Sequence, residues 1–188
     1  MRSAIVCLLA LATLAGGCDR ALPGKGQGGA DATSTASAAP VAVGTIDRSH
    51  AGEAAPDFAF QDASGSGVTL ARFHGAPVLV NIWATWCAPC IAEMPALDAL
   101  AARAPGGLRV VTISQDLNGA DAVLPFYKAK GIKALKPWLD PDLHFSTAMA
   151  ANLPVSILYG SNGREVWRVA GPMDWGDAAV AKQLAEAK

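Results

Sequence analysis

The feature that most constrains the fold is a continuous apolar run that leads directly into a pair of cysteines. Residues 78–83 read Val-Leu-Val-Asn-Ile-Trp, and Cys87 and Cys90 follow within Trp-Cys-Ala-Pro-Cys. A short β-branched run of this kind is typical of a strand buried on both faces. After Cys87, apolar residues recur at intervals of three and four, with Pro89 in the first turn, where proline is tolerated. The pattern predicts a buried strand feeding a helix, with Cys87 at the junction.

The position of Cys87 has chemical consequences. A helix N-terminus has unpaired N–H groups and roughly half a positive charge, so it stabilises a thiolate relative to a thiol. The thiolate is the attacking species in disulfide exchange. We therefore expect Cys87 to be the attacking cysteine and Cys90, one turn further along, to be the resolving one.

Two other uses of this cysteine pair are less well supported. A structural zinc site normally needs four ligands, and the sequence offers neither a second cysteine pair nor a histidine near Cys87 and Cys90. An inert disulfide would close a very short loop, and closing a short loop contributes little stability. Redox exchange is favoured, and no metal is expected.

Composition narrows the functional class further. The chain has 188 residues, which suits one domain plus extensions. Its formal net charge is −1, from 15 basic and 16 acidic residues, and it has no basic block, which argues against nucleic-acid binding. Two of its four cysteines, Cys7 and Cys18, lie near the N-terminus. The folded part is left with a single dithiol, which indicates a redox centre and not a disulfide framework.

The N-terminal region predicts export and a membrane anchor. Residues 1–17 hold one positive charge, a short apolar run and small residues, which indicates a signal peptide, because a membrane span needs about 20 apolar residues. Residues 14–18, Leu-Ala-Gly-Gly-Cys, resemble a bacterial lipoprotein cleavage box except at Ala15, so Cys18 is expected to be lipidated. Asp19 resembles the signal that retains lipoproteins in the inner membrane. Ordinary signal cleavage, which leaves a soluble periplasmic protein, is the alternative.

Residues 18–53 are rich in Gly, Ala, Ser, Thr and Pro and predict a flexible tether, with a reach on the order of 30 Å. Residues 54–188 form the predicted domain. Its middle alternates strands with helices and its end is an antiparallel hairpin, which indicates an α/β fold with a mixed sheet. The elements expected besides the strand and helix around Cys87 are a β-hairpin at 55–70, strands at 108–114, 155–159 and 165–169, and helices at 120–130, 144–151 and 177–187.

Three motifs carry a resemblance to a known family. Residues 81–90 read Asn-Ile-Trp-Ala-Thr-Trp-Cys-Ala-Pro-Cys, residues 93–95 read Glu-Met-Pro, and Leu153-Pro154 precedes a predicted core strand. Together they resemble the TlpA/ResA-like, membrane-tethered thiol–disulfide oxidoreductases of the thioredoxin superfamily. The resemblance covers residues 54–187. It implies a thioredoxin-like fold, with a mixed central sheet flanked by helices and an N-terminal β-hairpin extension.

The resemblance also implies how a partner protein binds. The family has a cis-proline at the position of Pro154, which would offer the backbone groups of Leu153 to an incoming peptide as a short strand. Trp86 and Pro89 are expected to supply an apolar lip beside the dithiol. Trp175 is expected to approach the site by analogy with the family.

Glu93 is the expected proton acceptor. Cytoplasmic thioredoxins have a buried aspartate where this chain has Asn81, and an amide cannot take a proton. Glu93 lies three residues after Cys90 and therefore on the same helix face. We expect it to exchange a proton with Cys90, which requires a pKa raised by partial burial. A solvated helix glutamate is the alternative.

The resemblance implies a reductase of protein disulfides outside the cytoplasm, with no cofactor besides the Cys87–Cys90 pair. Electrons would come from a membrane transporter of the DsbD/CcdA kind, and targets would include apocytochrome c or copper-delivery proteins of oxidase assembly. Oxidase or isomerase activity stays open, because the reduction potential sets the direction of exchange.

Two other functions on the same fold are alternatives. A copper chaperone would have two cysteines separated by three residues and a placed histidine or Met-rich motif, whereas this chain has Cys-x-x-Cys and neither of these features. A peroxiredoxin would have a Pro-x-x-x-Thr/Ser-x-x-Cys loop. In this chain Val80 stands where that motif has proline, and Thr85 is one residue too close to Cys87.

Overall fold

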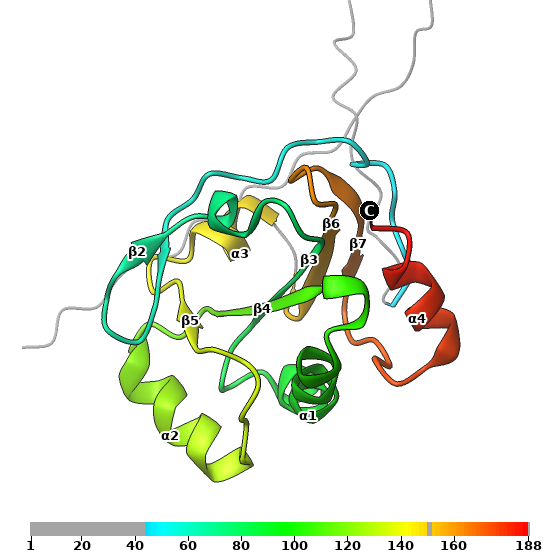
Figure 1. Ribbon diagram of the computed structural model, residues 1–188. Helices are drawn as coiled ribbons and strands as arrows, with labels where there is room; N and C mark the ends of the chain where they lie inside the picture. The colour runs from blue at the N-terminus through cyan, green and yellow to red at the C-terminus, as the bar shows by residue number, and fades with distance from the viewer. Residues whose placement is uncertain (1–43, 150–151, 188) are drawn as a thin grey trace, which may run out of the picture. The chain divides into compact units, whose positions relative to one another are not determined.

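The computed structural model describes residues 44–149 and 152–187. Seven strands form one sheet in the order β2-β1-β5-β4-β3-β6-β7 (Figure 1). At its centre, β3 (Val78–Trp83) pairs in parallel with β4 (Arg109–Ser114) and antiparallel with β6 (Val155–Tyr159). The sheet is therefore mixed, as predicted.

The outer strands complete the sheet on both sides. On one side β7 (Glu165–Ala170) is antiparallel to β6. On the other, β5 (Trp138–Leu139) is parallel to β4, and β1 (Phe60–Gln61) is antiparallel to both β5 and β2 (Gly67–Val68). The predicted hairpin is confirmed, but its first strand begins at Phe60 and not at residue 55.

In the described part of the chain, three α-helices and two short 3-10 helices lie between strands, and a fourth α-helix follows β7. Helix α2 has the predicted bounds. Helix α4 is shorter than predicted and begins one residue later, because Asp177 is its N-cap: the Asp177 carboxylate accepts the Ala179 N–H at 2.6 Å. The elements are α1 (Ala88–Arg103), α2 (Ala120–Lys130), α3 (His144–Met149), α4 (Ala178–Leu184), η1 (Leu70–Phe73) and η2 (Pro105–Gly107).

The alternation of β3 side chains explains why its sequence is apolar throughout. Leu79 and Trp83 pack into a core with residues of α1, α2 and α4, whereas Val80 and Ile82 pack into a second core with Phe145 of α3. Successive strand residues point to opposite faces, so both faces of β3 are covered. Asn81 shares the face of Leu79 and Trp83, which is the face that α1 covers.

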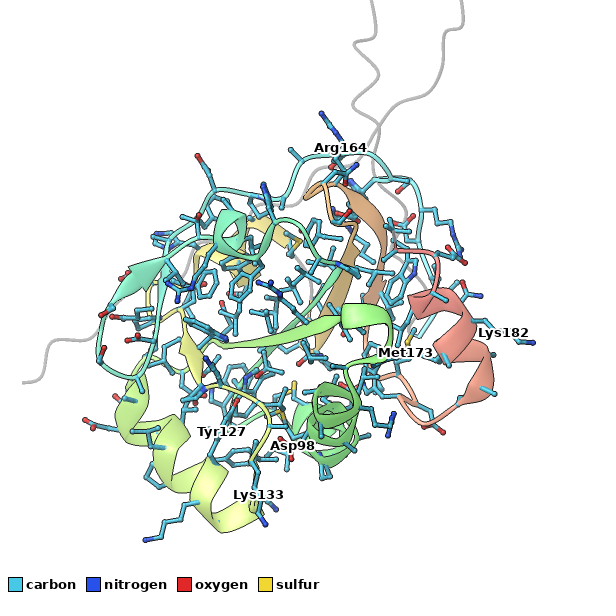
Figure 2. All side chains as sticks on the ribbon, viewed as in Figure 1. Asp98, Tyr127, Lys133, Arg164, Met173 and Lys182 are labelled. Carbon is cyan, nitrogen blue, oxygen red and sulfur yellow. A yellow bond between two sulfur atoms is a disulfide. The ribbon has the colours of Figure 1, made fainter. Side chains whose placement is uncertain are left out.

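Side chains also fix the loops around α1. The Asp98 carboxylate of α1 accepts the backbone N–H groups of Lys133, Ala134 and Leu135 at 2.8–3.3 Å (Figure 2). A single half-buried aspartate thereby holds the connection between α2 and β5 against α1.

The segment before the predicted domain boundary belongs to the fold. Gly44 donates its N–H to the Ala170 carbonyl at 2.9 Å, and Asp47 forms an antiparallel bridge with Arg168. These contacts cover the free edge of β7, which would otherwise expose unpaired backbone groups. The folded region therefore includes residues 44–53, which the sequence assigned to the tether.

The predictions for the signal peptide at 1–17, for Cys18 and for the rest of the tether lie outside the described residues. Within residues 44–149 and 152–187, no helix has the length and apolar character needed to cross a bilayer.

Candidate active site

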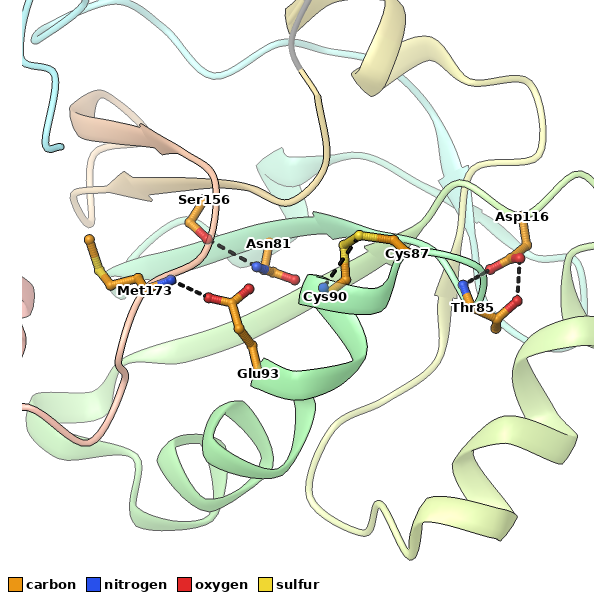
Figure 3. The surroundings of a disulfide bond; sticks show 8 residues. All are labelled: Asn81, Thr85, Cys87, Cys90, Glu93, Asp116, Ser156 and Met173. Atoms are coloured by element: carbon orange, nitrogen blue, oxygen red, sulfur yellow. Dashed lines mark hydrogen bonds between the residues drawn. A yellow bond between two sulfur atoms is a disulfide. The ribbon is translucent and has the colours of Figure 1, made fainter. Parts of the chain in front are cut away.

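Cys87 and Cys90 form a disulfide where β3 leads into α1 (Figure 3). Cys87 is the N-cap of α1, with extended backbone angles, and Pro89 lies in the first turn. The Cys90 N–H points at the Cys87 Sγ, 3.3 Å away. The predicted strand–cysteine–helix junction is thus the geometry that the chain adopts.

The two sulfurs differ in their access to the surface. Both cysteines are buried, but Cys87 borders a groove of about 630 Å³, and Cys90 is not among the described residues that line it. The groove is lined by Trp86, Cys87, Pro89, Gln115, Leu117, Leu143, Ser146, Asn152 and Leu153. A partner molecule in this groove would meet Cys87 first.

The groove brings together most of the residues predicted to bind substrate. Trp86 is 69% exposed, and Trp86, Pro89 and Leu153 all line the groove. The Leu153–Pro154 peptide bond is cis, as the family resemblance implied. Pro154 itself is buried and does not line the groove among the described residues.

On one side of the disulfide, Asp116 holds the loop that precedes Cys87 (Figure 3). Its Oδ1 accepts the Thr85 hydroxyl at 2.6 Å, and its Oδ2 accepts the Thr85 N–H at 2.9 Å and the Ser114 hydroxyl at 2.7 Å. Asp116 is buried. Asp116 was not among the predicted site residues. The available signal was its position just after the predicted strand at 108–114, because parallel neighbouring strands bring their carboxyl ends to one edge of the sheet.

On the other side of the disulfide, Glu93 is buried at 6% exposure, so the solvated alternative is wrong. Its Oε1 accepts the Met173 N–H at 2.6 Å and the Trp175 indole N–H at 3.0 Å, so Trp175 lies beside Glu93. Its Oε2 is buried and has no hydrogen-bond partner among the described residues. Desolvation raises the pKa of Glu93 from 4.5 to about 7, and the two hydrogen bonds oppose part of that rise.

Asn81 lies beneath α1 on the same side. Its amide nitrogen donates to the Ser156 hydroxyl at 3.0 Å, and its Oδ1 is buried without a hydrogen-bond partner among the described residues (Figure 3). The neutral amide of Asn81 does not titrate, whereas the raised pKa of Glu93 lets its carboxyl group titrate near neutral pH.

Comparison with known proteins places the chain in a family. The redoxin family model matches residues 50–184. The thiol–disulfide oxidoreductase ResA of Oceanobacillus iheyensis is 43% identical over 78 residues, which is 39% of this chain and 40% of the relative. ResA of Bacillus anthracis is 29% identical over 121 residues, which is 64% of this chain and 69% of the relative.

A solved structure described as a thiol:disulfide interchange protein DsbE, from Chlorobium tepidum, has a TM-score of 0.63 at 25% identity, with 72% of this chain and 96% of that chain covered. The chain spans about two fifths of the length of the first curated relatives that it matches. The chain belongs to the redoxin family, and its residues 50–184, which are similar in sequence to thiol–disulfide oxidoreductases, have a thioredoxin-like fold.

Proposed function

We propose that the protein is anchored outside the cytoplasm and reduces disulfides of specific partner proteins through Cys87 and Cys90. The observation that carries this proposal is the asymmetry of the disulfide: Cys87 borders the groove and caps α1, whereas Cys90 lies behind it. No cofactor besides the cysteine pair is part of the proposal.

The reaction proceeds in two exchanges. The Cys87 thiolate attacks one sulfur of the partner's disulfide, a Cys87–partner disulfide forms, and the other partner sulfur leaves as a thiolate. The Cys90 thiolate then attacks the Cys87 sulfur and releases the second partner sulfur as a thiolate. The partner gains two electrons, and the protein is left with the Cys87–Cys90 disulfide.

The start of α1 supports a thiolate at Cys87. The Cys90 N–H lies 3.3 Å from the Cys87 sulfur, and the first turn of α1 contains no acidic residue. The unpaired N–H groups and the positive end of the helix dipole favour the anion there. Cys87 is therefore the attacking cysteine in the first exchange.

Glu93 supplies the proton acceptor for the resolving step. It lies one turn after Cys90 on the same helix face, and a pKa of about 7 lets its carboxylate take the Cys90 proton near neutral pH. Oε2, the oxygen without a hydrogen-bond partner, is the atom that takes the proton.

The anchor and the pathway rest on the sequence. The Leu-Ala-Gly-Gly-Cys segment ending at Cys18 supports lipidation of that cysteine on the outer face of the inner membrane, with a soluble periplasmic form as the alternative. The TlpA/ResA-like motifs support a membrane reductant transporter of the DsbD/CcdA kind as electron source. The same motifs support cytochrome c maturation or copper-site assembly as the process served.

A trapping experiment tests the proposal. The full-length Cys90→Ala variant cannot resolve the first exchange, so it should accumulate partner proteins as mixed disulfides that a reductant releases. The matched Cys87→Ala variant keeps one cysteine of the pair and should trap none. Equal trapping by both variants, or none by either, would contradict the proposed roles.

A second experiment tests the lipid anchor. In the same cells, Cys18→Ser should move the protein from the membrane fraction to the soluble fraction, and an unchanged distribution would disprove the lipid anchor.

A further inference from the structure

Two leucines outside the disulfide and cis-proline segments, Leu117 and Leu143, help to line the groove. Of the described residues, three large apolar side chains stay markedly exposed, and two of them, Trp86 and Leu117, line the groove beside Cys87. Leu117, in the loop between β4 and α2, is 72% exposed. Leu143, in the loop before α3, lines the same groove. Exposed apolar groups that gather at one place indicate a binding surface.

Leu117 is held in its exposed position by buried neighbours. The residue before it, Asp116, accepts three hydrogen bonds from Thr85 and Ser114. Gln115 is buried as well, and its side-chain amide donates to Asp140 at 3.1 Å and accepts the Ser146 N–H at 3.2 Å. Hydrogen bonds thus hold the two residues that precede Leu117, and they support the exposed position of its side chain.

Leu143 occupies a backbone conformation that leucine avoids. Its φ is +60°, in the left-handed region where a branched side chain clashes with its own backbone. Glycine or asparagine would fit there with less strain. Its N–H donates to the Asp140 carbonyl at 3.1 Å, and its carbonyl accepts the Thr147 N–H at 3.0 Å. Leu143 therefore occupies a strained position and also lines the groove beside Cys87. This combination points to a function for its side chain.

The lining of the groove specifies the chemistry of its occupant. The described residues that line it carry no charge, and their polar members are Gln115, Ser146 and Asn152. The occupant must also bring a sulfur to Cys87. A charged side chain next to that sulfur would lose hydration without gaining an ion pair, whereas an apolar side chain would bury surface against leucine.

We propose that Leu117 and Leu143 form a specificity subsite that selects an apolar side chain adjacent to the reactive cysteine of a partner protein. The inference rests on the proposed disulfide exchange and adds the class of partner: an uncharged segment with a leucine-like residue beside its cysteine. The segment lies along the groove, its cysteine at Cys87 and its apolar side chain between the two leucines.

Two kinds of probe test this subsite. The first is a set of short peptide disulfide dimers that differ in one residue, leucine or aspartate, placed directly before or directly after the cysteine. The second is hydroxyethyl disulfide, which has no side chain for the subsite. The reduced full-length protein should reduce the leucine dimers about tenfold faster than the aspartate dimers, measured as kcat/KM, because a leucine side chain becomes largely buried.

Leu117→Ser and Leu143→Asn are the test variants, and Leu124→Ser is the matched control. Leu124 lies on α2, is 43% exposed and does not line the groove. Asparagine tolerates positive φ, so Leu143→Asn keeps the backbone while it removes the apolar side chain. Both test variants should lose most of the leucine preference and keep their rate on hydroxyethyl disulfide. The control should keep both.

The outcomes separate this inference from the proposed function. Failure to reduce any of the disulfides would overturn the exchange activity itself. Reduction of hydroxyethyl disulfide with equal rates on leucine and aspartate dimers would overturn the subsite and leave the activity standing. A leucine preference that survives both test variants, or that Leu124→Ser removes equally, would place the selectivity elsewhere and also overturn the subsite.

Discussion

Glu93 and Asp116 are two buried carboxylates that flank the same disulfide, one on each side (Figure 3). Asp116 receives three hydrogen bonds spread over both of its oxygens. Glu93 receives two, both at Oε1, and its Oε2 has no partner among the described residues. The two sites differ in how completely the surrounding donors satisfy the negative charge.

That difference separates a carboxylate that holds a loop from one whose pKa burial raises. Donors on both oxygens compensate Asp116 for lost hydration. Two of the three donors belong to Thr85, in the loop that leads into Cys87, so the carboxylate fixes this loop in place. Burial without full compensation disfavours the charged form of Glu93 and raises its pKa to about 7. The same functional group thus positions the loop at one end of the dithiol and, at the other, is the proton acceptor that we propose.

The largest expected effect comes from removing the Asp116 charge. In Asp116→Asn, the NH2 group of the new amide replaces one acceptor oxygen and cannot accept hydrogen bonds from Thr85 or Ser114. The free energy of unfolding should therefore fall by about 3 kcal/mol. Urea unfolding measures this change, with Asp142→Asn, at an exposed aspartate, as the control. The variant should reduce small disulfides more slowly while its pH–rate profile keeps an inflection near 7. A loss of that inflection would assign proton transfer to Asp116 and break the comparison.

The next effect is a gain in stability in Glu93→Gln. Between pH 4.5 and about 7 the folded protein holds the Glu93 proton more tightly than the unfolded chain, so the wild-type free energy of unfolding falls as pH rises through this window. Glutamine cannot ionise, and it keeps an acceptor oxygen for the Met173 and Trp175 donors. The variant should be more stable than the wild type at pH 8, by about 2 kcal/mol, with the difference shrinking towards pH 5.

The same variant tests the catalytic role of Glu93. Its exchange rate should fall about tenfold near pH 7, and its profile should lose the inflection near that pH, because Cys90 no longer has a nearby proton acceptor. Stopped-flow measurement of mixed-disulfide resolution from pH 5 to 9 shows both changes. An unchanged profile would leave Glu93 with no part in proton transfer.

The smallest effect sharpens the comparison within the Glu93 site. Trp175→Phe removes the indole N–H that donates to Oε1 at 3.0 Å, so the charged form loses one of its two hydrogen bonds. The pKa of Glu93 should rise further, and the free energy of unfolding at pH 8 should fall by about 1 kcal/mol. The inflection of the pH–rate profile reports the pKa. A downward shift of that inflection would contradict the assigned hydrogen bond.

Local patterns predicted the parts of the fold that depend on local physics. The run at 78–83 predicted β3 to the residue, and the helix at 120–130 matches α2, because hydrophobic periodicity reports which faces are buried. The i, i+3 spacing from Cys90 to Glu93 placed the carboxylate correctly on the helix face. These predictions needed no knowledge of distant partners.

Other features depend on contacts between distant segments and had no local signal. Strand β5 has two residues and exists because it pairs with β4 and β1. Residues 44–53 carry a linker-like composition, yet they pair with β7, whose edge needs a partner. The positive φ of Leu143 belongs to a loop whose hydrogen bonds place it there.

The amino-acid sequence alone determined the dithiol, its place between a buried strand and a helix, and the carboxylate one turn further on, because each follows from residue type and short-range spacing. Tertiary structure alone decided what surrounds that carboxylate, which sulfur meets the groove and which loop Asp116 holds. Burial and hydrogen bonding there involve residues from β4, from the loop before α3 and from the segment after β7, and their proximity arises only when the sheet assembles.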